Sequence, residues 1–416
     1  MPIDVSGEVP QKAGLSPVKR LQTLIPGLIT GTGDVDPSFV VTATVIGAAY
    51  QFSLLWLVLL CIPILITIFD VSARIGHETH QGLVELLREQ YGMWLGVVCA
   101  VLIVLINMAM IVADSVAVTD AMSIVLGEKR QVFIVLVSFV VWYILIFRDY
   151  RRIVRFMVWA AMPLFAYVVS AVISGPDLKI LAQGVLFPRV APTPDYAAAI
   201  LGIFGSLLTP YLLVWQTSSR REMATHGPVQ MGSAEHRFGG MITILLSFCI
   251  IVSAASVLHL TSPTDMSTSD AAKALTPAVG GLGSILFAVG IIGSGFVALP
   301  ILVASMCYSV AEAFGWNYGL SEHPWEAKRF YVMISFSMLF AAAANLVGVN
   351  LVKLLYLSQV LAGVLAIPIL VFILLLSNDR RVMRTTNSRW QNFWIGAASG
   401  GLLATGGMVL FLKLFT

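Results

Sequence analysis

The alternation of apolar and polar positions divides most of the chain into long apolar runs separated by short polar breaks. A run of about 20 apolar residues can cross the hydrocarbon core of a bilayer as a helix. The pattern therefore predicts an all-α polytopic membrane protein with about 11 transmembrane helices. The expected spans are 22–50, 53–74, 92–117, 131–147, 153–174, 196–219, 239–261, 280–312, 327–347, 351–376 and 392–414.

Composition agrees with this pattern. The chain is 58% hydrophobic and 11% charged, whereas soluble domains carry about 25% charged residues. The net charge of +3 gives no reason to expect a nucleic-acid partner. The four cysteines lie in apolar runs without a CxxC pair, and we interpret them as buried small hydrophobic residues.

The distribution of basic residues predicts the orientation. Eighteen of the 25 lysines and arginines fall in segments that are cytoplasmic if the N-terminus is cytoplasmic. This bias predicts a cell inner membrane protein with a cytoplasmic N-terminus and an extracytoplasmic C-terminus. The expected divisions are a tail (1–21), a first set of five spans (22–174), an extracytoplasmic loop (175–195), a second set of five (196–376), and a cytoplasmic loop with span 11 (377–416).

Two spans are predicted to be broken. In span 1, Gly33 and Pro37 interrupt the run, and Asp36-Pro37 is a favourable helix start, with aspartate at the N-cap and proline in the first turn. In span 6, Thr209-Pro210 has the same form. Spans 1 and 6 open two five-span sets, and an odd number of spans inverts the second set relative to the first. Paired broken helices in inverted halves indicate a transporter site near the membrane midplane.

The break in span 1 also predicts a cation site. Unwound turns leave carbonyl oxygens that can ligate a cation, and Asp36 adds a negative charge. The alternative is that Asp36 only caps the second half-helix. Asp34 could line a vestibule or face water, and Thr209 could be a ligand or a cap. Gln216 and Gln359 could line the site or form interhelical hydrogen bonds.

The motifs at these two breaks resemble those of the NRAMP (SLC11-like) metal-ion transporters. Asp36-Pro37-Ser38-Phe39 stands in the place of an Asp-Pro-Gly-Asn motif, and Thr209-Pro210-Tyr211 in the place of Met-Pro-His. The resemblance extends over about residues 22–414. It is closest to the NRAMP-related magnesium transporter branch, through the stretches 73–92, 209–219, 286–316 and 352–368.

The resemblance implies a LeuT-type 5+5 inverted-repeat fold with the ion between spans 1 and 6. It implies that Asp36 binds the metal and that the carbonyls of Gly33 and Ser206 face it. Thr209 replaces the family's methionine, and an oxygen in place of a thioether suits Mg²⁺ or Mn²⁺. Ser38 and Phe39 are further candidates to line the site, although Phe39 replaces a ligating asparagine.

The residues associated with proton coupling in the family are mostly absent. Tyr211 replaces the motif histidine, Ala117 stands where the family has a glutamate, and span 9 lacks charge. Asp114 remains, either as a relay or as a structural charge. We therefore expect import of a divalent metal ion (Mg²⁺ or Mn²⁺) by alternating access without proton coupling, and no cofactor other than the transported ion.

Other functions remain open at this stage. An ion-coupled symporter of a small cationic or zwitterionic organic solute would use the same fold, and a cation channel is a further alternative. The stretch 77–80 (HETH) invites comparison with a zinc-protease motif, but its histidines are three rather than four residues apart. We expect no enzymatic activity. The Gly-rich stretch 396–407 suits close helix packing or a homo-oligomer contact.

Overall fold

The computed structural model describes residues 17–187, 193–225, 233–258, 282–346 and 351–415. Within these residues the secondary structure is helical, and no strand is present. The helices are α1 (Pro17–Gly33), α2 (Pro37–Tyr50), α3 (Leu55–Thr79), α4 (Leu83–Tyr91), α5 (Met93–Leu126), α6 (Arg130–Phe147), α7 (Tyr150–Ala161), η1 (Met162–Phe165), α8 (Ala166–Ile173), α9 (Leu178–Leu186), α10 (Pro194–Leu207), α11 (Pro210–Thr225), α12 (Ser233–Val257), α15 (Leu282–Phe314), α16 (Lys328–Leu346), α17 (Leu351–Asn378) and α18 (Arg389–Phe415).

The prediction of a polytopic helical membrane protein is confirmed. Ten helical segments of the described chain are long and apolar enough to cross a bilayer, and the short apolar helices Leu24–Gly33 and Pro37–Tyr50 together form one further, broken span. Large apolar side chains on the outer helices face outward. Val135 on α6 is 69% exposed and Leu339 on α16 is 70% exposed, as expected of a surface that contacts lipid.

Both predicted breaks are present. Span 1 is divided into α1 and α2 by Asp34, Val35 and Asp36, and span 6 is divided into α10 and α11 by Leu208 and Thr209. Asp36 is the N-cap of α2, and its carboxylate accepts a hydrogen bond from the Phe39 amide. The predicted helix start at Asp36-Pro37 is therefore confirmed.

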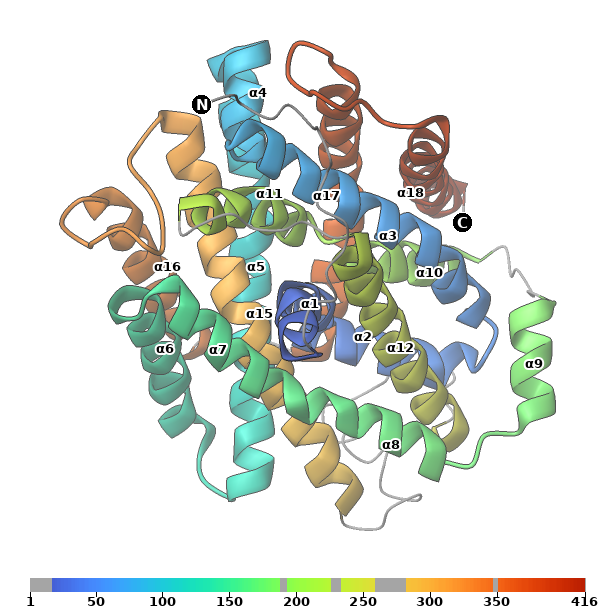
Figure 1. The fold of residues 1–416 in the computed structure, drawn as a ribbon. Helices are drawn as coiled ribbons and strands as arrows, with labels where there is room; N and C mark the ends of the chain where they lie inside the picture. Colours follow the sequence, from blue (N-terminus) through green and yellow to red (C-terminus); the bar gives the residue numbers. More distant parts are fainter. Residues whose placement is uncertain (1–16, 188–192, 226–232, 259–281, 347–350, 416) are drawn as a thin grey trace, which may run out of the picture.

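Two packing groups of helices surround the breaks, and α10, α17 and α18 pack mainly against one another beside them. Helices α1, α2, α3, α11 and α12 pack mainly against one another, whereas α5, α6, α15 and α16 form a second group. Figure 1 shows α1 near the centre of the molecule, with the second group to one side of it. The two groups meet chiefly where α11 lies against α15.

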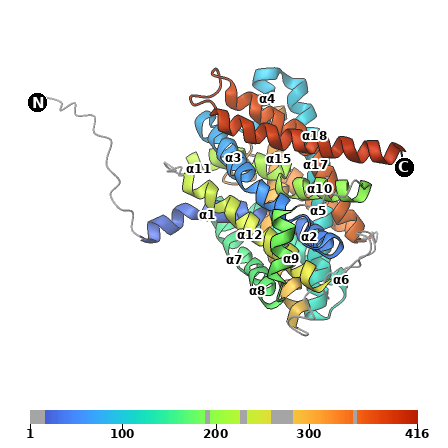
Figure 2. The same cartoon turned by 90° about the vertical axis from the view of Figure 1, so that its right-hand side faces the viewer.

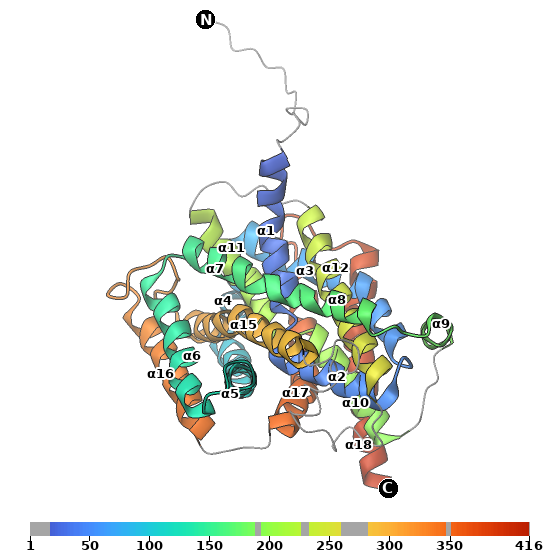
Figure 3. The ribbon, with the colours of Figure 1, turned by 90° about the horizontal axis from the view of Figure 1, so that it is seen from below.

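The ends of the described chain leave the bundle on opposite sides. The start of α1 and the end of α18 lie at opposite faces in Figures 2 and 3. An odd number of membrane crossings places the two ends of a chain on opposite sides of the bilayer. Figure 3 also shows that α11 runs toward the face at which α1 begins.

Two short helices lie in connections between the predicted spans. Helix α4 follows α3, and four of its apolar residues (Leu83, Val84, Leu86 and Leu87) are buried. Helix α9 lies within the predicted loop 175–195, of which residues 188–192 fall outside the described part. Helices of nine residues are too short to appear in a search for spans, which is why the apolar pattern did not reveal them.

Candidate functional site

The two helix breaks meet at the centre of the bundle and are joined by hydrogen bonds. Thr209 Oγ1, at the break in span 6, donates to Asp34 Oδ1 at 3.0 Å. The Tyr211 hydroxyl lies 2.7 Å from the Gly33 carbonyl oxygen and 3.2 Å from Asp36 Oδ2. A tyrosine hydroxyl carries one proton, so it can donate to only one of these two oxygens at a time. The other oxygen remains available to a further partner.

Asp36 is the most highly connected side chain of this centre. Its Oδ1 accepts hydrogen bonds from the Phe39 amide at 2.6 Å and from Gln359 Nε2 on α17 at 3.0 Å. Asp36 is fully buried. Four elements therefore converge on one carboxylate: the break in span 1 and helices α2, α11 and α17.

A third aspartate belongs to the same centre. Asp114 on α5 is fully buried, and its Oδ1 accepts hydrogen bonds from the Ser38 amide at 3.0 Å and from Ser38 Oγ at 2.5 Å. Ser38 follows Asp36 by two residues, so Asp114 lies beside the same helix break. Asp114 thus links α5 of the second packing group to the N-terminus of α2.

The charge of this centre is not balanced by basic side chains. Within the residues described, no lysine or arginine forms an ion pair with Asp34, Asp36 or Asp114. Buried charge without a counter-ion is unfavourable unless a cation or a proton neutralises it.

Several buried acceptor atoms at the centre also lack a donor from the described chain. They are Asp34 Oδ2, Asp114 Oδ2 and Gln359 Oε1. Buried polar atoms nearly always have a hydrogen-bond partner. Bound species that offer positive charge or hydrogen-bond donors would supply the missing partners.

These side chains do not by themselves form a closed metal cage. Among the described residues, no three Asp, Glu, His or Cys side chains come together as a group that could hold a metal ion. Any cation held here would therefore depend on carbonyl, hydroxyl and amide oxygens or on its own water as well.

The side chains of three other predicted site residues do not bond to the aspartates. Ser206 Oγ donates to the Gly202 carbonyl within its own helix at 2.6 Å. Gln216 donates to Thr30 Oγ1 at 3.0 Å rather than to an aspartate. The Phe39 ring is 1% exposed and belongs to the apolar core.

Sequence reasoning missed one polar residue of this centre. Thr243 Oγ1 on α12 lies 3.0 Å from the Gly31 carbonyl oxygen of α1 and 3.3 Å from the Gly239 carbonyl oxygen of its own helix, so it can donate to the chain just before the break in span 1. It is one of several small hydroxyl residues in an otherwise apolar helix, and nothing in the sequence singles it out. Only the packing of α12 against α1 reveals its position.

Two broken helices that meet at a buried polar centre within a bundle of spanning helices define a secondary membrane transporter. Residues 27–412 match the family model described as Nramp, natural resistance-associated macrophage protein-like. The chain therefore belongs to the Nramp family.

Curated relatives agree with this assignment. A protein named divalent metal cation transporter MntH from Pectobacterium carotovorum is 24% identical over 382 residues, which cover 89% of each chain. A protein of the same name from Aeromonas hydrophila is 23% identical over 395 residues, which cover 92% of this chain and 93% of the relative.

Solved structures show the same fold. A manganese transporter from Eremococcus coleocola, in complex with an aromatic bis-isothiourea substituted compound, has a TM-score of 0.68 at 18% identity, covering 98% of this chain and 97% of its own. MhsT in complex with L-phenylalanine has a TM-score of 0.59 at 13% identity, covering 93% and 98%. The expectation of a LeuT-type fold is confirmed.

Proposed function

We propose that this protein transports divalent metal cations across the membrane, with Mg²⁺ or Mn²⁺ as the substrate. The observation that carries the proposal is the group of three buried aspartates at the meeting of the two helix breaks, without a basic partner among the described residues. Membership of the Nramp family and the names of its relatives, a divalent metal cation transporter and a manganese transporter, support it.

The available ligand atoms favour a hard cation. Around Asp34 and Asp36 the structure presents the Gly33 carbonyl, the Thr209 and Tyr211 hydroxyls and the Gln359 amide. Oxygen ligands suit Mg²⁺ and Mn²⁺ better than softer metals. Asp36, Asp34 and the Gly33 carbonyl are the proposed direct contacts, and Ser206 is proposed to contribute its carbonyl when the site opens.

The acceptors without donors indicate that the cation keeps part of its water shell. Mg²⁺ loses water reluctantly and usually retains several water molecules in proteins. Water on a cation is a hydrogen-bond donor, and Asp34 Oδ2, Asp114 Oδ2 and Gln359 Oε1 are acceptors. In this proposal, Asp114 and Gln359 hold the hydrated ion from its outer side.

Transport requires the site to open to each side in turn. Asp34 and Asp36 are fully buried in this structure, so neither side of the membrane has access to them. We propose alternating access with the N-terminus in the cytoplasm, and import driven by the inside-negative potential. Each charge then contributes about 2.3 kcal/mol per 100 mV.

We further propose that transport is not coupled to protons. Tyr211 occupies the place where the family motif has histidine, and its hydroxyl bonds to Gly33 or Asp36 instead of providing a group that titrates near neutral pH. Asp114 is engaged by Ser38 at the helix start. An organic-solute symporter remains the alternative, but an aspartate cluster and the Nramp relatives favour a metal cation.

The test is uptake into proteoliposomes. We would measure Mg²⁺ and Mn²⁺ entry under an imposed negative potential for the parent protein, Asp36→Asn and Asp149→Asn. Asp149 is an exposed aspartate remote from the centre, so its variant controls for the loss of one carboxylate. We expect uptake by the parent and Asp149→Asn and its loss in Asp36→Asn. Folded parent protein that takes up neither ion would contradict the proposal.

A further inference from the structure

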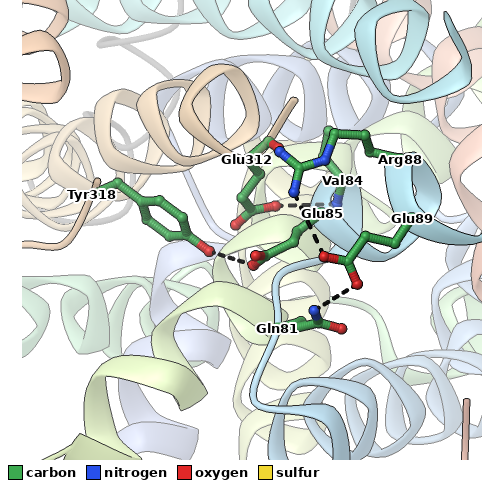
Figure 4. Close-up of polar contacts among 7 residues, drawn as sticks. All are labelled: Gln81, Val84, Glu85, Arg88, Glu89, Glu312 and Tyr318. Carbon is green, nitrogen blue, oxygen red and sulfur yellow. Dashed lines mark hydrogen bonds and ion pairs between the residues drawn. The ribbon is translucent and has the colours of Figure 1, made fainter. Parts of the chain in front are cut away.

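A second buried carboxylate lies outside the aspartate centre, on α15. Glu312 is fully buried two residues before the end of this helix. Figure 4 shows its side chain beside the start of α4, together with Arg88, Glu85 and Tyr318. An ionisable residue inside a membrane-spanning helix is rare and usually functional.

The Glu312 carboxylate is bound by groups from two other elements. Glu312 Oε2 accepts a hydrogen bond from the Val84 amide in the first turn of α4 at 3.1 Å. Glu312 Oε1 accepts a hydrogen bond from Ser218 Oγ on α11 at 2.6 Å. A helix N-terminus favours a negative charge, because its amides point at the carboxylate and its dipole is positive there.

The neighbouring residues hold Glu312 in place. Arg88 donates to its backbone carbonyl at 2.7 Å and also pairs with Glu89. Tyr318 donates to Glu85 at 3.0 Å. At Gly82, the N-cap of α4, an added Cβ would collide with the Glu312 carboxylate. The carboxylate thus fills the space that a side chain at position 82 would need.

The Ser218–Glu312 bond connects the two packing groups. Ser218 lies on α11, which packs with α3, whereas Glu312 lies on α15, which packs along α5. Ser218 follows Tyr211 by seven residues on the same helix, so it lies about 10 Å from the aspartate centre along the helix axis. It lies on the side toward which α11 runs, the face at which α1 begins.

We propose that Glu312 is a gating residue that keeps this side of the transporter closed. The Ser218–Glu312 bond holds α11 against α15 and the start of α4 while the aspartate centre is sealed. Opening toward the face where α1 begins separates α11 from α15 and breaks this bond. Because the bond is remade on closing, its strength sets the equilibrium between closed and open forms.

The proposal goes beyond the choice of substrate and can be tested without a metal ion. The reporter is Thr30→Cys, introduced into a background in which the four native cysteines are replaced by alanine. Thr30 lies on α1 between the aspartate centre and the start of that helix, and it is 5% exposed. We would measure the rate at which a membrane-impermeant thiol reagent labels this position.

Two variants break the contact without changing Glu312. Ser218→Ala removes the donor from α11, and Gly82→Ala displaces the carboxylate from α4. The matched control is Gln81→Ala, which removes an exposed bond to Glu89 in the same connection. We expect about tenfold faster labelling in both variants, equivalent to about 1.4 kcal/mol, and the parent rate in the control.

Two results would overturn the proposal. One is the parent rate in Ser218→Ala, whether or not Gly82→Ala accelerates labelling, and the other is equal acceleration in Gln81→Ala. Thermal melting of each variant identifies any that fails to fold, and Ser218→Ala and Gly82→Ala each test the contact from a different side. Failure of metal uptake would leave the labelling result intact, because labelling requires no substrate.

Discussion

The Tyr211 hydroxyl lies 2.7 Å from the Gly33 carbonyl oxygen and thereby joins the two broken helices directly. Its other neighbour is Asp36 Oδ2 at 3.2 Å. The tyrosine thus occupies oxygen atoms that a cation at this centre would use. In the closed form the hydroxyl donates its one proton to one of these two oxygens at a time, and binding of an ion to that oxygen has to compete with the hydroxyl.

Tyr211→Phe tests this competition. The variant keeps the buried ring and removes the hydroxyl, which frees the acceptor that the hydroxyl occupied. Without metal we expect it to be less stable by about 1–3 kcal/mol, since a buried acceptor loses its donor. The rise in melting temperature on adding Mg²⁺ or Mn²⁺ should be larger than in the parent. An equal rise in both proteins would contradict a competing role for the hydroxyl.

Asp34→Asn should have opposite effects on stability and on binding. The amide oxygen can still accept a hydrogen bond from Thr209, but one of three buried negative charges is removed. Without metal the protein should become more stable, because uncompensated buried charge is relieved. Affinity for the divalent ion should fall by about tenfold to a hundredfold. Thermal melting and isothermal titration measure the two effects separately, and a fall in stability alone would show a purely structural aspartate.

Ser38→Ala should destabilise the start of α2. It removes the hydroxyl that donates to Asp114 at 2.5 Å and leaves only the backbone amide bond. We expect a loss of about 1.5–3 kcal/mol, the value of a hydrogen bond to a charged group. Ser206→Ala is the matched control, because its hydroxyl bonds only to a carbonyl within the same helix. Similar melting temperatures for the two variants would exclude an anchoring role for Asp114.

Gly205→Ala should disturb the centre through helix packing. Helices α10 and α17 meet here, and an added Cβ would collide with the Gln359 carbonyl and lie 2.5 Å from the Gly363 amide nitrogen. The overlap should push α17 and its Gln359 side chain away from Asp36 and cost about 1–3 kcal/mol.

The control for this substitution lies one turn earlier on the same helix. At Gly202 an added Cβ would have its nearest neighbours at 3.6–3.8 Å, which is ordinary contact. Gly202→Ala should therefore retain both stability and metal affinity. A loss of affinity in Gly202→Ala as large as in Gly205→Ala would disconnect the effect from Gln359.

Uncoupled transport predicts accumulation that follows the membrane potential alone. At 100 mV a divalent ion gains about 4.6 kcal/mol, which corresponds to more than about a thousandfold accumulation at equilibrium. A pH-sensitive dye inside the liposomes should record no acidification during uptake. The ratio of the metal concentration inside the liposomes to that outside should not change with an imposed pH gradient. Acidification in step with metal entry would show proton coupling.

Much of the molecule followed from local sequence features. The lengths of the apolar runs predicted the spans, because a bilayer imposes one length on every helix that crosses it. Asp36-Pro37 and Thr209-Pro210 predicted both breaks, because proline and an N-cap residue act on the backbone next to them. Membership of the Nramp family was likewise visible in the order of such motifs.

Contacts between distant residues were decided only by the tertiary structure. Gln216 and Gln359 are both lone polar residues in apolar runs, yet only Gln359 bonds to Asp36 in this structure, whereas Gln216 bonds to Thr30. Thr243 and Glu312 likewise acquire their partners from helices far away in the chain. Helix propensity and hydrophobicity describe how a segment sits in the membrane, but they do not specify which face of one helix meets which face of another. Packing decides that, and in this protein it decides which oxygen atoms surround the aspartates.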